Sequence, residues 1–378
     1  MQPDPHTLID QIRVAGLQFL MTGHTDDFRR IIGPLFEPGT FDTDTCRVYI
    51  AHGPAPDRSR VLAACQDAVG TRAFVTRCLA YEGDVIVITP LNTPAGSPAT
   101  GWDLTGMRLR HLLEPLPDWH LGGSGISSLD HVAQAYRDAS NALLSARYTA
   151  ERAALYSSDI RLASVVGPGA ASWAATFLAP LLAQPAGRAE QLVDTVRLGL
   201  VFNHSAAAKM IPTGRNVVAK RMRYVGTLLG LNLNRFPDRA ALDLALEINA
   251  TADCNATPSS GTPTLADLLY TPEVHNWAES LLGRLDADTR PLRRTVTTWL
   301  TRDGHVVGTA KALGLRPAAI REHLRAAEAL LHRRLLGSLP SEADESDLGV
   351  VGSGGVYLAA AALGDVEIDT WPDIQRKL

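Results

Sequence analysis

The feature that most constrains this chain is an internal repeat in its C-terminal two-thirds. The motif Trp-Ala-x-x-Phe-Leu begins at Trp173, and a near copy, Trp-Ala-x-x-Leu-Leu, begins at Trp277. Each motif leads into an amphipathic run, at residues 192–201 in copy one and 292–301 in copy two. A repeat of about a hundred residues is too long for a solenoid unit and suits a small domain. The chain is therefore predicted to contain a duplicated domain.

The composition is that of an ordinary globular protein. The chain has 378 residues, of which 46% are hydrophobic and 20% charged, enough for packed cores in more than one domain. Its four cysteines form no Cys-x-x-Cys pair, which argues against a zinc site or a disulfide framework and favours a reducing compartment. No basic leader and no run of about eighteen apolar residues is present. We therefore expect a cytoplasmic protein without a membrane span.

The net charge of −4 hides an uneven distribution of charge. Residues 191–235 carry seven bases against one acid, and residues 290–334 carry ten bases against three acids. The rest of the chain must then carry a net charge of −17. Positive charge that is concentrated in the two repeat copies is the electrostatic pattern expected of a protein that binds a polyanion. The alternative is a pair of solvated basic helices.

Residues 1–150 combine helical and strand patterns. Alternating apolar residues predict strands, apolar residues at helical spacing predict helices, and Glu82-Gly83-Asp84 lies between two β-rich runs as the turn of a hairpin. The predicted helices are at 8–19, 60–69, 107–113 and 128–147, and the predicted strands are at 47–51, 73–80 and 85–88. This region is therefore predicted to be an α+β domain.

In each copy the amphipathic run is followed by a short helix of small residues, a tight turn and a basic helix. These three parts lie at 205–210, 212–214 and 215–225 in copy one, and at 307–313, 314–315 and 316–325 in copy two. Small residues let a second helix approach closely, as a helix-turn-helix requires, and its second helix presents its first residues to the DNA major groove. The spacing therefore predicts two helix-turn-helix units.

Copy one resembles the C-terminal helix-turn-helix domain of the PucR/CdaR family of bacterial transcription regulators. The matching positions are Asn203-x-Ser205-Ala206-x-Ala208-Lys209, Arg215-Asn216-x-Val218-x-x-Arg221-x-Arg223, Leu228-x-Gly230-Leu231-x-Leu233 and Asp238-Arg239-x-x-Leu242-x-Leu244-Ala245-Leu246. Copy two is similar but has Pro317-Ala318 where the family has Arg-Asn, and it adds the acidic Glu322. Base reading, packing, dimerisation and non-specific phosphate contact are all open for copy two.

The N-terminal region resembles, more weakly, the degenerate GGDEF-like domain of CdaR-type regulators. The matching positions are Ser127-Ser128-Leu129-x-x-Val132-x-x-Ala135-Tyr136-x-x-Ala139-x-x-Ala142-Leu143, together with the preceding strand at 122–126. The hairpin Tyr81-Glu82-Gly83-Asp84-Val85 lacks the Gly pair and the adjacent carboxylates of an active cyclase. The resemblance therefore implies a sensory or dimerising domain and no catalytic residues.

The candidate binding residues follow from these patterns. Arginine and asparagine at the start of a recognition helix bond base edges bidentately, while neighbouring lysines and arginines neutralise phosphates. We expect base reading by Arg215, Asn216 and Ala219, phosphate contacts by Lys220, Arg221 and Arg223, and backbone contacts or a dimer interface formed by Arg316, Arg321 and Arg325.

Three other patterns have plainer interpretations. The glycine cluster at 122–125 is read as a turn rather than a phosphate loop, because no Lys-Ser/Thr follows it. His24 with Asp26 and Asp27 is read as a polar loop rather than a metal site. Cys46 and Cys78 fall on predicted strands and are read as buried small hydrophobes, with redox sensing as the alternative.

These inferences combine into one prediction. We expect an α+β, degenerate GGDEF-like domain with a mixed sheet at 1–150, all-α helix-turn-helix domains at 151–250 and 264–340, and an acidic linker and C-terminal helix at 341–378. The expected function is sequence-specific regulation of transcription by a non-enzymatic protein without cofactor or metal. Its expected partners are double-stranded DNA, a second copy in a homodimer and a small-molecule effector. The alternative is a scaffold whose basic helical domains bind a protein.

Overall fold

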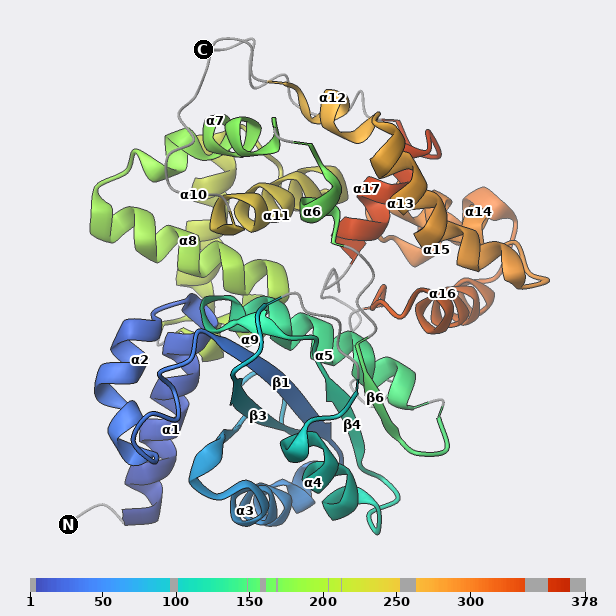
Figure 1. Cartoon of the computed structure of the whole chain (residues 1–378). Helices are drawn as coiled ribbons and strands as arrows, with labels where there is room; N and C mark the ends of the chain where they lie inside the picture. The colour runs from blue at the N-terminus through green and yellow to red at the C-terminus, as the bar shows by residue number, and fades with distance from the viewer. Residues whose placement is uncertain are drawn as a thin grey trace. The chain divides into compact units, whose positions relative to one another are not determined.

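The chain forms two compact units (Figure 1). The computed structural model describes residues 5–95, 101–147, 149–156, 161–167, 169–202, 204–211, 213–251, 263–336 and 353–367. The first unit comprises Met1–Ser158 with Ser205–Thr213, and the second comprises Asp159–His204 with Gly214–Leu378. The second unit thus holds residues of both repeat copies, and the finer domain boundaries given above stay a prediction. The polar linker predicted at 249–264 and the acidic residues 342–347 lie largely or wholly outside the described residues.

A mixed sheet forms the centre of the first unit. Its strands are β1 (Thr45–His52), β2 (Phe74–Arg77), β3 (Asp84–Leu91), β4 (His120–Gly123), β5 (Ser127–Ser128) and β6 (Ala153–Leu155). The strand order is β2-β3-β1-β4-β6, with β5 also paired to β1. β1 runs antiparallel to β3, β4 and β5, whereas β4 and β6 are parallel. The predicted hairpin is confirmed, because β2 and β3 pair antiparallel.

Helices cover both faces of this sheet. The helices of the first unit are α1 (Pro5–Thr22), α2 (Thr25–Ile31), α3 (Arg58–Val69), α4 (Leu104–Leu113), α5 (Val132–Ala146) and most of α9 (His204–Met210), and its 3-10 turns are Gly33–Leu35, Ala55–Asp57, Gly70–Arg72 and Leu129–His131. Side chains alternate between the two faces of β1, and Tyr49 and Ala51 lie on the face that packs against α3 and α4. α1 and α5 contact the sheet as well. The expected α+β domain is therefore confirmed in outline.

The glycine cluster of the sequence serves packing. Gly122 lies within β4, and a Cβ atom there would collide with the carbonyl oxygen of Ala139 on α5. Glycine is therefore needed for the close approach of α5 to the sheet. Gly122 and Gly123 end β4, which confirms for these two the strand that the resemblance implies at 122–126 and corrects the interpretation of them as a turn.

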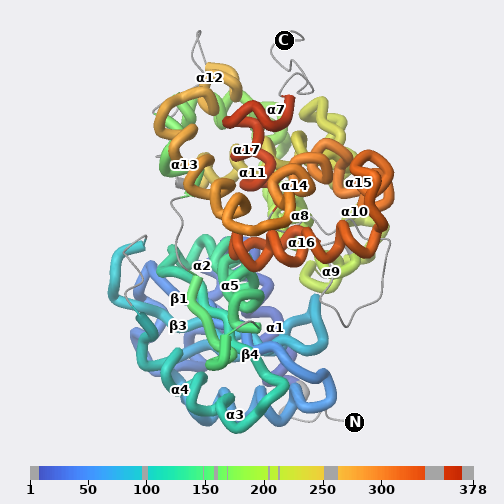
Figure 2. Tube along the Cα trace, turned by 90° about the vertical axis from the view of Figure 1, so that its right-hand side faces the viewer, coloured from blue at the N-terminus to red at the C-terminus, as the bar shows by residue number. Residues whose placement is uncertain are grey.

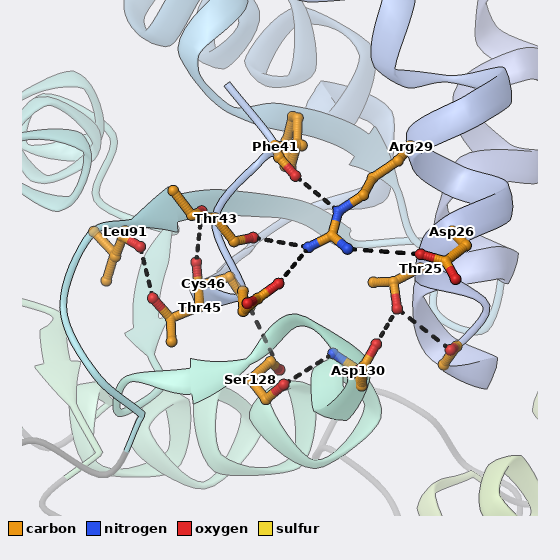
Figure 3. A network of polar contacts seen from close by, with 12 residues as sticks. Thr25, Asp26, Arg29, Phe41, Thr43, Thr45, Cys46, Leu91, Ser128 and Asp130 are labelled. Atoms are coloured by element: carbon orange, nitrogen blue, oxygen red, sulfur yellow. Dashed lines mark hydrogen bonds and ion pairs between the residues drawn. The ribbon is translucent and has the colours of Figure 1, made fainter. Parts of the chain in front are cut away.

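Arg29 on α2 joins the loop before β1 to the helical layer (Figure 3). Its Nε donates to the carbonyl of Phe41 at 2.9 Å, and its Nη2 donates to the carbonyl of Thr43 at 3.1 Å and to Asp44 at 2.8 Å. Thr25, at the start of α2, donates to Asp130 in the turn before α5. These contacts hold α2 against the loop before β1 and against the turn before α5.

A buried arginine anchors α4. Arg47 on β1 is 3% exposed, and its Nη1 donates to the carbonyl of Gly101 at 2.9 Å and lies 3.4 Å from Asp103 Oδ2. Tyr49 donates to the same carboxylate oxygen at 2.8 Å, and burial raises the pKa of its phenol. Asp103 Oδ1 accepts from the N–H of Gly106 and so caps α4. One carboxylate therefore satisfies a buried cation, a buried hydroxyl and a helix end.

The second unit is entirely helical in its described residues and shows the repeat as structure. Copy one contributes α6 (Leu162–Val165), α7 (Ala170–Leu182), α8 (Ala186–Val201), α10 (Arg215–Leu229) and α11 (Phe236–Thr251). Copy two contributes α12 (Leu265–Leu269), α13 (Pro272–Leu282), the 3-10 turn Gly283–Ala287, α14 (Leu292–Leu300), α15 (Val306–Leu313) and α16 (Pro317–Leu331), and α17 (Ser353–Ala362) follows it. The C-terminal helix predicted at 356–363 is confirmed as α17. No helix of the described residues is long and apolar enough to cross a membrane.

The same residues are buried in both copies. Trp173 and Trp277 are 5% and 6% exposed, so both lie in the core. The buried stripes of α10 and α16 match position by position: Val218, Met222, Val225 and Leu229 in copy one, and Ile320, Leu324, Ala327 and Leu331 in copy two. Both helices have 15 residues and end in a left-handed residue, Gly230 or His332. The repeat is therefore a structural duplication.

We expect Asp103→Ala to lower the free energy of unfolding of the first unit by about 3–5 kcal/mol, because it leaves Arg47 buried without its carboxylate. Hydrogen exchange in urea, which follows each unit separately, measures this loss. The control is Glu151→Ala, which removes the partner of Arg110 at the surface and should change stability by less than about 1 kcal/mol. Equal losses for the two variants would contradict the anchoring role of Asp103.

Candidate nucleic-acid interface

In copy two a tight turn with a glycine joins the helices α15 and α16. α15 ends at Gly314, whose φ of 67° and ψ of 27° are left-handed, and the N–H of Leu315 donates back to the carbonyl of Ala310 at 3.0 Å. Arg316 then adopts an extended N-cap conformation, and Pro317 opens α16 at a position where it needs no N–H. A turn of this length with a glycine is the connection that the motif requires.

Three helices hold this turn in place. α14, α15 and α16 all contact one another, as Figure 2 shows. Thr309 and Ala310, the small residues of α15, are buried. Thr295 on α14 lies 2.9 Å from Nδ1 of His323 on α16, which links the outer helix to the second helix of the motif. The face of α16 opposite this core is left to solvent.

That solvent face of α16 carries mixed charge. Arg316 and Arg325 are exposed, Arg321 is half-buried, and the acidic Glu322 is exposed between them. The second carboxylate of the helix, Glu328, is buried and accepts the N–H groups of Leu335 and Leu336 at 2.7 and 2.8 Å, and burial raises its pKa. Glu328 thus serves the turn after α16, and Glu322 alone places negative charge on the outer face of this helix.

The corresponding helix of copy one has a purely basic outer face. α10 contains no acidic residue, and Arg215, Asn216, Lys220 and Arg223 are all exposed. Arg215 and Lys220 form no ion pair within the described part of the chain. Ala219 is half-buried, and its carbonyl accepts from Arg223 Nε at 3.4 Å. The first turns of α10 therefore bring together one amide and three cations at the surface.

Arg221 differs from its neighbours on α10. Its Nη1 donates to Thr195 and its Nη2 to Gln191, each at 3.2 Å, so this guanidinium is bonded to α8. Nearby, the guanidinium of Arg188 on α8 lies 4.6 Å from the ring centroid of Tyr224 on α10. The sequence grouped Arg221 with the phosphate-binding residues, whereas the structure uses it to fasten α10 to α8.

Sequence reasoning missed one exposed residue of α10. Val217 is 40% exposed, whereas the adjacent Val218 is fully buried. Val217 therefore lies off the buried stripe and beside Asn216 at the start of the helix. An exposed valine there is suited to apolar contact with a thymine methyl group. The sequence signal for this exposed residue is an apolar side chain that falls outside the helical spacing of the buried stripe.

The two helices predicted for the copy-one motif fall in different compact units. Residues 205–213, which include most of α9, belong to the first unit, and α10 belongs to the second. Asn203 and Pro212, two residues of this segment named above, lie outside the described residues. Copy two has the predicted order of helix, turn and helix, and the helix-turn-helix motif stays a prediction for both copies.

The hairpin of the first unit uses its carboxylate internally. Asp84 at the start of β3 is 4% exposed; its Oδ1 lies 2.6 Å from Nδ1 of His52, and its Oδ2 accepts from Tyr136 at 3.3 Å. The same hydroxyl lies 3.8 Å from the sulfur of Cys78. Asp84 thus joins the hairpin to β1 and α5, and this role occupies both of its oxygens.

The interpretation of His24, Asp26 and Asp27 as a polar loop is wrong for the two aspartates, which lie in the first turn of α2. No group of three or more potential metal ligands is present among the described residues, and Asp26 and Asp27 pair with Arg29 and Arg30 on the same helix. Burial raises the pKa of the thiols of Cys46, Cys65 and Cys78 to about 12. These three thiols are therefore protonated at neutral pH, which disfavours reactivity.

The chain matches no family model and no curated protein. Among solved structures it is similar to the crystal structure of a regulator of polyketide synthase expression from Bifidobacterium adolescentis. The two are 19% identical with a TM-score of 0.29, and the match covers 67% of this chain and 96% of that chain. A likeness at this level does not establish a family, so the resemblance to PucR/CdaR regulators stays a prediction.

We expect Gly314→Ala to destabilise the second unit by about 1–2 kcal/mol, because alanine must adopt the left-handed conformation there. The matched control is Gly308→Ala on α15, in the same motif, which should stabilise by about 0.5–1 kcal/mol because the site is helical and uncrowded. Both changes are measured by unfolding the protein in denaturant and monitoring hydrogen exchange in residues 306–331. A neutral Gly314→Ala would contradict the turn geometry.

Proposed function

We propose that this chain is a DNA-binding regulator of transcription whose two helical modules contact double-stranded DNA. The observation that carries the proposal is the pair of helices α15 and α16 in copy two, joined by a tight turn with a glycine, together with the position-by-position match of the buried stripe of α16 to that of the basic helix α10. A duplicated fold that repeats the same solvent-facing helix supports a shared ligand. The positive charge of both segments favours a polyanion as that ligand.

Copy one is proposed to supply direct base readout. Arg215 and Asn216 begin α10, are exposed, and are side chains that bond guanine and adenine edges in pairs. Val217 adds an apolar contact beside them, while Lys220 and Arg223 neutralise phosphates. We retain Ala219 as a base contact through its small size, and we assign Arg221 to holding the helix rather than to phosphate.

Copy two is proposed to contact mainly the DNA backbone. Arg316, the N-cap residue of α16, and Arg325 on α16 are exposed, and Arg321 is half-buried between them. The start of the helix offers Pro317 and Ala318, which cannot bond base edges bidentately. Glu322 limits how closely this face approaches phosphate. The module therefore adds affinity more than base discrimination.

The first unit is proposed to act as a sensory domain for a small-molecule effector. A hollow of about 460 Å³ is lined by Met107, Arg110 and His111 of α4 and by Glu151 and Arg152 before β6. Its charged groups already bond within the protein, since Arg110 donates to Glu151 at 2.6 Å. An effector that binds there must therefore compete with this ion pair.

We expect Arg215→Ala to relax base preference and to weaken binding to a selected duplex by about 1–3 kcal/mol. Arg223→Ala should instead weaken binding to selected and random duplexes alike, because it removes a phosphate contact. Fluorescence anisotropy with both duplexes at one salt concentration measures the two effects. Equal losses for both variants on both duplexes would rule out the assignment of roles.

The second candidate is a scaffold whose basic modules bind an acidic protein. The exposed Glu322 on α16 and the internal use of Arg221 favour it over a purely electrostatic DNA clamp. Salt separates the two functions: we expect the logarithm of the DNA association constant to fall steeply with the logarithm of salt concentration, at about −0.9 per neutralised phosphate. An absence of salt-dependent DNA affinity would favour the scaffold.

A further inference from the structure

The two modules contact each other through equivalent helices. α11, the last helix of copy one, packs against α7, and α17, the helix that follows copy two, packs against α13 in the same way, so α17 corresponds to α11. α11 and α17 also pack against each other. Figure 2 shows α11 and α17 side by side, flanked by α7 and α13.

One contact between α11 and α17 lies near the beginning of both helices. A Cβ atom on Gly354, the second residue of α17, would lie 3.7 Å from the Cβ of Ala240, the fifth residue of α11. α17 is buried along almost its whole length, as a run of small residues between two helices requires. Small side chains thus bring the two starting ends together.

A second contact joins α11 to copy two. The ring centroids of Phe236 and Trp299 are 5.0 Å apart, and the N–H of Phe236 donates to Asp303 Oδ1 at 3.0 Å. Arg235 Nε lies 3.9 Å from the other oxygen of Asp303. Asp303 lies in the loop between α14 and α15, so copy one is fastened directly to copy two.

An element that packs against its own counterpart is the mark of a two-fold arrangement. In a head-to-tail repeat each unit presents one surface to a different surface of the next unit, whereas in a two-fold pair the same surface meets itself. The approach of the starting ends of α11 and α17 fits the second arrangement. Figure 1 shows α10 and α16 on opposite sides of the α11–α17 pair.

We propose, on the basis of the proposed function, that one chain supplies both halves of a DNA-binding pair and takes a duplex with two inverted, unlike half-sites. A two-fold arrangement places α10 and α16 in opposite directions along the DNA, as a homodimer places its two recognition helices. The half-sites are unlike because α10 begins with Arg215 and Asn216, and α16 begins with Pro317 and Ala318. The chain therefore needs no second copy to fill one site.

An engineered disulfide between α11 and α17 tests the pairing of the modules in the absence of DNA. In the full chain with Cys254→Ser, the pair Ala240→Cys and Gly354→Cys has the Cβ separation that a disulfide needs. We expect oxidation to give an intrachain crosslink, found by peptide mass spectrometry. The control pair Ala240→Cys and Gly187→Cys places the second cysteine at an open position on α8, so it should not crosslink within a chain. A crosslink formed only between chains would overturn the proposal.

The DNA arrangement is tested with the consensus duplex that the full chain selects from a random-sequence library. We expect one chain per duplex by mass photometry, two inverted half-sites of different sequence, and a loss of about tenfold or more when the α10 half-site is scrambled. The oxidised, crosslinked variant should bind as tightly as the uncrosslinked chain. Reversing the orientation of one half-site, so that the two half-sites become direct repeats, should weaken binding.

The outcomes separate the two proposals. Two chains on a site with identical halves, or a crosslinked chain that loses DNA affinity, would overturn the intrachain pairing and leave the DNA-binding function standing. Failure of the library to yield any preferred duplex would overturn the DNA-binding function and, with it, the inference about half-sites. The crosslink result then still reports whether the modules pair within one chain.

Discussion

The buried stripe along α10 and α16 is the contact on which the second unit depends. Val218, Met222 and Val225 in copy one, and the matching residues of copy two, face the module core at a spacing set by the helical period. Once that stripe is buried, the remaining positions of each helix must face solvent. Arg215 and Lys220 are exposed for this reason, so the packing of the core selects the side chains that a ligand can meet.

Helical and strand periods made much of the fold predictable from the sequence. The stripe of α10, the hairpin of β2 and β3 and the core positions of Trp173 and Trp277 all follow from local spacing. Arg221 was not predictable in the same way, because its partners Gln191 and Thr195 lie on another helix and its spacing is that of a solvent-facing base. The local pattern predicts which face of its helix a residue occupies. Whether a charged side chain on that face is already hydrogen-bonded depends on the neighbouring helix.

The same limit applies to contacts between segments that are far apart. Nothing near Asp103 in the sequence indicates that its carboxylate meets Arg47, Tyr49 and the start of α4. The alanine-rich α17 is apolar all round, so its sequence predicts burial without naming α11 or α13 as its neighbours. The hairpin sequence likewise does not indicate that the two oxygens of Asp84 meet His52 and Tyr136. A carboxylate held in this way is a structural crosslink rather than a free ligand.

Duplication within one chain changes what a two-fold pair can become. In a homodimer every substitution appears twice, so both recognition helices keep the same side chains and the bound DNA must repeat. Here α10 and α16 belong to one chain, and the contacts between α11 and α17 join their modules whatever the outer faces carry. α10 is thereby free to keep Arg215 and Asn216, while α16 carries Pro317 and Ala318 and tolerates Glu322. On the proposed function, the pair divides between its halves two tasks that a homodimer must perform in each, because base discrimination rests on bidentate side chains and affinity rests on phosphate contacts.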